Sequence, residues 1–182
     1  MASSVQTLSE SDRRLVAEWA AICAERVLPV FEAESPRDTR PRAAIARTRA
    51  FARGELDTAS QIRQRFGGGS AAGDTKSPAA AAAARAAGQA SAVCHMGAHA
   101  LGAAAYAVKA ASLAASDRPE AADNEIRWQL AQMAAGVRAA LHSLPPVGED
   151  RSGPLGPGLL ASGQIGMIIR QIQAHLGEMG AP

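Results

Sequence analysis

The sequence predicts an all-α fold, a single-domain bundle of about six helices, and two observations indicate this. Of the 182 residues, 44 are Ala and only 3% are aromatic. Ala is the best helix former, whereas strands favour branched and aromatic side chains. The length suits one domain with its own hydrophobic core. Because Ala is small, the helices should approach one another closely around an Ala-rich central helix.

The first expected helix has the clearest signals. Ser9 or Ser11 can cap its start, and apolar residues that include Leu15 and Trp19 recur at helical spacing. Pro29 has no backbone N–H, so we expect a kink or a restart there. The helix should bury its apolar stripe.

The later helices follow from similar signals. Gly54 should end the second helix, and Asp117 with Glu120 should cap the segment that follows the Ala-rich region. The glycine-rich stretch 67–76 should be a mobile loop without an apolar anchor. The expected helical segments are 38–53, 58–66, 78–115 as one bent helix or two, 117–144 and 159–179.

These signals divide the chain into three parts. Residues 1–145 should form the bundle, and 146–158, rich in Pro and Gly, an irregular connector. Residues 159–182 should form an amphipathic helix that docks on the bundle or on a second copy in a homodimer. Its apolar stripe consists of Ile165, Ile168, Ile169, Ile172, Leu176 and Met179.

Basic residues gather in one region, although the net charge of the whole chain is only +2. Residues 37–65 carry eight Arg against three acidic residues. On a helix, Arg42, Arg49 and Arg53 share one face with Asp38. This face is either a binding surface for an anion or a partner, or a salt-bridged surface. Few aromatic residues interleave the arginines, which argues against nucleic-acid binding. Arg49 should be partly buried and paired with Asp38 or with a Glu of the first helix.

A polar stripe is expected on the Ala-rich segment. His95 and His99 are four residues apart, so on one helix both rings could reach the same divalent metal ion. Two ligands do not complete a site, and packed histidines are the alternative. The stripe continues through Tyr106 and Lys109, and Gly102 should leave a gap for a neighbouring helix or a small molecule. No complete catalytic set is evident, so neither an enzyme nor a required cofactor is predicted.

The expected location is the cytoplasm. Only two cysteines occur, without a CxxC motif, and the first fourteen residues lack the apolar stretch of a secretory leader. The low-polarity stretch 79–115 is mostly Ala and is too weakly apolar to span a bilayer.

Three segments together resemble the helical family of immunity proteins of bacterial toxin systems, the immunity-five-like group. They are DRRLVAEWAAICAERVLPVFE (12–32), DTRPRAAIARTRAFARGE (38–55) and CHMGAHALGAAAYAVKA (94–110), and the resemblance covers about residues 10–140. The chain differs from the family in the GGGSAAGDTKSP loop and in the tail after Pro145.

The resemblance implies a non-catalytic protein that neutralises a cognate toxin by binding it. The alternative is a small-molecule or metal-binding protein, with a possible enzymatic, resistance or sequestration role, that uses the face of His95, His99 and Tyr106.

Overall fold

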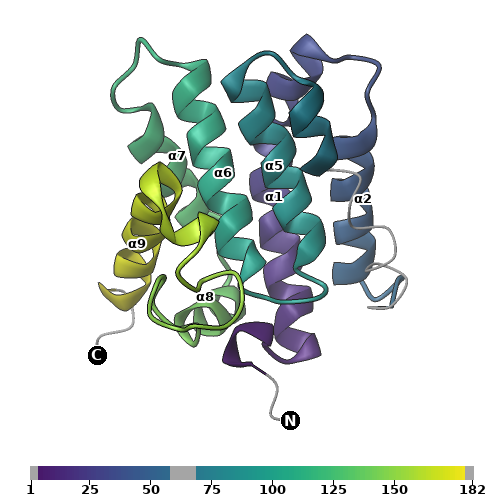
Figure 1. Ribbon diagram of the computed structural model, residues 1–182. Helices are drawn as coiled ribbons and strands as arrows, with labels where there is room; N and C mark the ends of the chain where they lie inside the picture. The colour runs from purple at the N-terminus through teal and green to yellow at the C-terminus, as the bar shows by residue number, and fades with distance from the viewer. Residues whose placement is uncertain (1–3, 58–68, 179–182) are drawn as a thin grey trace.

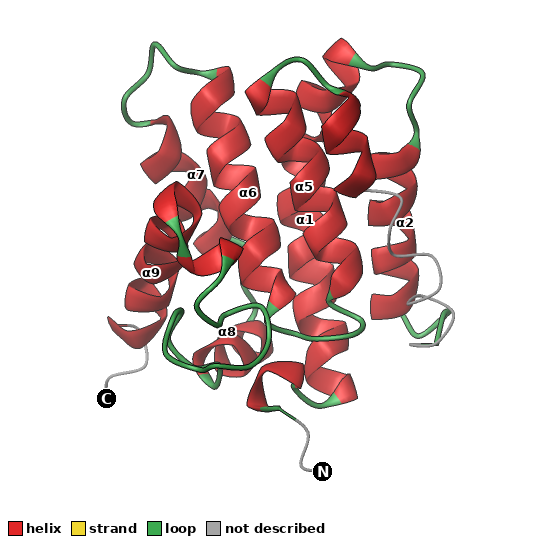
Figure 2. Cartoon of the chain, viewed as in Figure 1, coloured by secondary structure: helices red, strands yellow, loops and turns green. Residues whose placement is uncertain are grey.

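The chain folds into an all-α bundle, as the composition predicts. The computed structural model describes residues 4–57 and 69–178, in which every regular element is helical. Figures 1 and 2 show the long helices side by side. The α-helices are α1 (Glu10–Glu34), α2 (Arg40–Ala52), α5 (Pro78–Ala92), α6 (His99–Ala114), α7 (Ala121–Ala131), α8 (Ala135–His142) and α9 (Gly163–Glu178), with short 3₁₀ turns η1 (Val5–Thr7), η2 (Ala71–Asp74) and η3 (Leu159–Ala161).

Helix α1 lies at the centre and packs against α2, α5, α6 and α8. The Ser9 hydroxyl accepts a hydrogen bond from the Asp12 backbone N–H at 3.1 Å and caps the helix start, as expected. The helix continues through Pro29 as one element. The expected burial of Leu15 is wrong, because this side chain is 44% exposed. Because α1 carries small alanines, the Ala-rich helices α5 and α6 pack closely on the face next to Leu15. Val16, which lies on that face, is therefore buried instead of Leu15.

The Ala-rich segment forms two helices, α5 and α6, which lie side by side in Figure 1. Ser77 caps α5 through its side chain, as predicted. The turn between the helices is held by the N-terminal segment, because the N–H groups of Gly97 and Ala98 donate to the carbonyls of Thr7 and Gln6 at 3.1 and 3.0 Å. These external hydrogen bonds favour a turn over one continuous bent helix.

The expected single helix over 117–144 is wrong. It is divided into α7 and α8, and no side chain caps the start of α7 at Glu120. The Arg138 guanidinium donates to the Leu130 carbonyl at 2.7 Å, which satisfies a backbone group left open where α7 ends. Gly136, at the start of α8, lets Leu15 of α1 approach closely. Contacts from Arg138 of α8 and from Leu15 of α1 therefore support the break between α7 and α8.

The predicted loop 67–76 has more structure than its composition suggests. The expected short helix 58–66 and the start of this loop lie outside the described residues. Within the described part, Ala71–Asp74 forms η2, and Ala71 and Ala72 are buried against α5. The expectation that this stretch has no apolar anchor is wrong, because η2 lies so close to α5 that the Ala71 and Ala72 methyl groups anchor it.

The connector 146–158 is irregular but is held by a buried amide. The Gln6 side chain is fully buried, and its Nε2 donates to Asp150 Oδ2 at 3.1 Å and to the Ser152 carbonyl. Its Oε1 accepts from the Leu155 N–H at 2.9 Å. A buried amide with three partners fixes the connector against the start of the chain.

Helix α9 packs along α6 and α8 of the same chain. Gln173 joins it to the end of the bundle, because its Nε2 donates to the Pro145 carbonyl and its Oε1 accepts from the Val147 N–H, both at 3.0 Å. The predicted stripe is buried in the described part of α9: Ile165, Ile168, Ile169, Ile172 and Leu176. Met179 lies outside the described residues.

Candidate functional site

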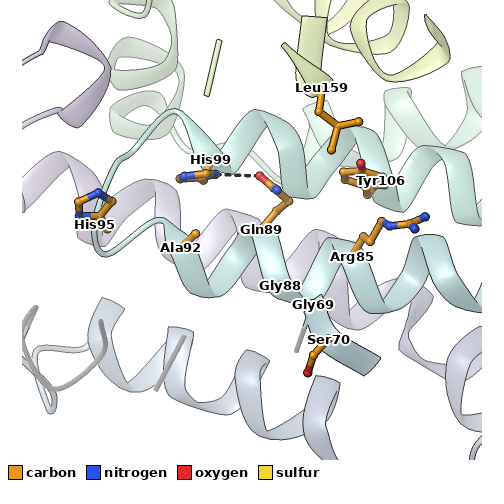
Figure 3. Close-up of a pocket in the computed structure, with 10 residues that line it drawn as sticks. All are labelled: Gly69, Ser70, Arg85, Gly88, Gln89, Ala92, His95, His99, Tyr106 and Leu159. Carbon is orange, nitrogen blue, oxygen red and sulfur yellow. Dashed lines mark hydrogen bonds between the residues drawn. The ribbon is translucent and has the colours of Figure 1, made fainter. Parts of the chain in front are cut away.

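A cavity of about 660 Å³ opens beside α5 and α6. Figure 3 shows side chains from both helices, with Leu159 of η3 above them and Gly69 and Ser70 on the other side of α5. The volume lies in the range of small-molecule sites. Its lining consists of Gly69, Ser70, Arg85, Gly88, Gln89, Ala92, His95, His99, Tyr106 and Leu159.

A hydrogen bond between the two helices crosses the cavity floor. His99 Nδ1 lies 2.8 Å from Gln89 Oε1, and because a carbonyl oxygen only accepts, the imidazole N–H donates (Figure 3). Gly102 makes this contact possible, since a Cβ at this position would lie 2.5 Å from Gln89 Oε1. The gap expected at Gly102 is therefore filled by Gln89 and by Leu160.

Arg85 and Tyr106 form one end of the cavity (Figure 3). The Tyr106 side chain is buried, and this burial raises the pKa of its hydroxyl, against a smaller opposing effect of the Arg85 charge. The hydroxyl therefore stays neutral near pH 7. Arg85 is exposed at the rim, and no ion pair to it is found within the described residues.

His95 and His99 both line the cavity but do not lie on one helix. The prediction that both rings project from the same helix face is therefore wrong. His95 lies in the turn between α5 and α6, which the N-terminal segment holds, whereas His99 is the first residue of α6. In the part of the chain that the structure describes, no group of three or more His, Cys, Asp or Glu could hold a metal ion. Metal analysis of tag-free protein tests the remaining alternative, since stoichiometric zinc that is lost in His95→Ala would reveal a site.

The sequence analysis did not predict the long polar side chains that α5 contributes to the cavity. Arg85 and Gln89 are four residues apart on α5, which is otherwise almost entirely Ala, so their spacing predicts one shared face. Lys109, which was expected in the polar stripe, is half-buried on α6 and does not line the cavity. The stripe therefore reaches the cavity only as far as Tyr106.

The basic face of α2 meets an acidic face of α1. Arg42 binds Glu32 through two hydrogen bonds of 2.7 Å, and Arg49 binds Glu25 at 2.6 and 2.7 Å. Glu25 and Glu32 are seven positions apart on α1, as are their partners Arg49 and Arg42 on α2. We call this the charged face: Glu18, Glu25 and Glu32 of α1 with Arg42, Arg49 and Arg53 of α2.

Asp38 does not belong to the charged face, although the helical spacing placed it there. It precedes α2 and binds Arg40, whose Nε and Nη2 atoms lie 3.0 and 2.6 Å from its carboxylate oxygens. These hydrogen bonds hold the pKa of Asp38 below its ordinary value. Arg40 also reaches Asp74 of η2, so this pair joins the start of α2 to the loop.

Arg49→Ala is expected to lower the free energy of unfolding by about 1 kcal/mol. The predicted partner class is confirmed, because Arg49 binds Glu25 and lies 3.6 Å from Glu18. Its side chain is 27% exposed and that of Glu25 is 48% exposed, so water screens the pair and the loss is small. Urea unfolding measures it, with Arg151→Ala in the exposed connector as control. A loss above about 3 kcal/mol would mean that the pair behaves as a buried one.

Comparison with known proteins agrees with the resemblance seen in the sequence. No helix of the described residues is long and apolar enough to cross a membrane. Neither the curated proteins nor the solved structures contain a match. A family model with the description "Imm-5 like putative immunity protein" matches residues 6–136, which is more than two thirds of the chain and includes α1, α2, α5, α6 and α7. The chain therefore belongs to the Imm-5 like immunity protein family.

Proposed function

We propose that this protein neutralises a cognate toxin protein by binding it stoichiometrically, without turnover. The observation that carries the proposal is the family match, which extends over most of the bundle. Family descriptions of this kind point to a protein partner, so the partner expected here is a toxin made by the same cell. We infer a cytoplasmic location, where the two buried free cysteines, Cys23 and Cys94, would remain reduced.

The charged face is our candidate for the contact surface. Its ends are accessible, since Arg42 is 62% exposed and Arg53 is 53% exposed. The acidic residues of α1 and the arginines of α2 lie there in two neighbouring rows of opposite charge. Such a pattern favours one partner over others, because a misaligned partner meets like charges.

Growth assays test the proposal directly. Each gene adjacent to that of this protein is expressed in a test strain, alone and together with the protein. We expect one product to arrest growth and this protein to restore it. If such a toxin were found and the protein failed to restore growth, the proposed function would be wrong.

A charge-reversal variant tests whether the charged face is the contact surface, separately from whether the protein neutralises a toxin. Arg42→Glu is expected to weaken protection while the melting temperature changes little, because Arg42 is exposed. Arg151→Glu, far along the chain in the exposed connector, is the matched control and should protect fully. Full protection by Arg42→Glu would exclude the charged face as the contact and leave the neutralisation itself standing.

A further inference from the structure

We propose that the cavity beside α5 and α6 binds a small amphipathic organic anion. Its anionic group would lie at Arg85, and its apolar body would lie along the α5 and α6 walls towards Leu159. This inference does not depend on the toxin, because it rests on the cavity alone.

The walls suit an apolar body. Gly88 and Ala92 present almost no side chain to the cavity, and Gly69 lies so near Gly88 that a Cβ on Gly69 would be 3.8 Å from the Gly88 Cα. The buried Tyr106 ring forms part of the opposite wall. Leu159 stands over the opening and is 72% exposed, whereas Leu155 and Leu160 beside it in sequence are buried. A ligand would remove the Leu159 side chain from water.

The charges around the cavity favour an anion. The described residues of its lining include Arg85 and two histidines, and none of them is Asp or Glu. The arginines of the charged face already bind carboxylates of this chain, whereas the structure assigns Arg85 no acidic partner among the described residues. A guanidinium at the rim can therefore accept a carboxylate or sulfonate from outside through two parallel N–H donors.

The polar groups also limit the class of ligand. Among the lining residues that the structure describes, Arg85 is the one whose side chain is charged at every relevant pH. A polyanion such as a nucleoside triphosphate would find no second permanent cation among these described lining residues. Gln89 and His99 hold each other across the floor, so the centre of the cavity keeps its shape when a ligand enters. A monoanion with an apolar body fits these features best.

Two fluorescent probes that differ only in charge test the proposal on the full-length protein. Anilinonaphthalene sulfonate carries a sulfonate, and N-phenyl-naphthylamine has the same aromatic body without it. We expect saturable one-to-one binding of both. Arg85→Gln should weaken the sulfonate probe about tenfold, roughly the effect of one charge-assisted hydrogen bond. The neutral probe should bind as before.

Two further variants test whether the probes bind in the cavity beside α5 and α6. Ala92→Phe fills the cavity from its α5 wall and should abolish the binding of both probes. Arg151→Gln, an exposed arginine in the connector, should change neither. Circular dichroism and melting curves establish that each variant is folded. The proposal is overturned if folded Ala92→Phe still binds the probes, or if Arg85→Gln and Arg151→Gln affect the sulfonate probe equally.

Discussion

A chain that ends after Pro157 is expected to lose cooperative unfolding. The truncation removes α9 and its five buried apolar side chains, which pack on α6 and α8. Burial of five such side chains contributes about 8 to 15 kcal/mol of gross transfer free energy. The net stability of a whole domain is about 5 to 15 kcal/mol, so the shortened chain should not remain folded. Thermal unfolding followed by circular dichroism measures this.

A pair of point variants on α9 tests the same contact with less disruption. Ile169 is fully buried and Met167 is 62% exposed, two residues earlier on the same helix. Ile169→Ala should lower the free energy of unfolding by about 2 to 5 kcal/mol, and Met167→Ala by less than about 0.5 kcal/mol. A truncated chain that stays folded and monomeric, from a parent that is a dimer, would show instead that α9 is the dimer contact.

Trp19→Ala should lower the free energy of unfolding by about 3 to 5 kcal/mol. Trp19 is one of the largest fully buried side chains, and its Nε1–H donates to the Gln129 carbonyl at 2.9 Å. This bond joins α1 to α7 across the core. Trp19→Phe removes this hydrogen bond and part of the buried ring system, while the Gln129 carbonyl keeps its hydrogen bond from the Gln132 N–H at 3.2 Å. The substitution should still cost about 1 to 3 kcal/mol.

The second tryptophan provides the control. Trp128 is half-buried, and its ring lies 4.0 Å from the Arg26 guanidinium, near the surface. Trp128→Phe should cost less than about 1 kcal/mol, because an exposed cation–π contact contributes little. Urea unfolding of the three variants ranks them. Equal losses for Trp19→Phe and Trp128→Phe would contradict the role given to the Gln129 contact.

Most of the fold was predictable because helix formation is local. Composition and apolar spacing were enough to place α1, α2 and α9, and Ser9 and Ser77 cap helices as their residue types suggest. The division of 78–115 into two helices was one of two alternatives that the sequence left open, because the carbonyls of Gln6 and Thr7 that hold the turn at 93–98 are distant in sequence. The break at 132–134 was not predicted, because the Arg138 side chain that stabilises it belongs to a segment expected to be one continuous helix.

The candidate site was predictable only in part. Tyr106 and His99 are seven residues apart on α6, so helical spacing placed them correctly on one face. The partner side of the cavity comes from α5, and its position depends on how the two helices turn back on each other at 93–98. Spacing on one helix cannot show which residues of another helix lie opposite, so Gln89 was missed.

Titration of purified toxin with this protein tests the central proposal most directly. A stoichiometric binder should reduce the toxin activity in proportion to the amount added, until none remains at about one equivalent. The titration should not change with longer incubation, because no turnover is involved. Complete loss of toxin activity with a small fraction of one equivalent would contradict the account, since only a catalyst that modifies the toxin could act in this way.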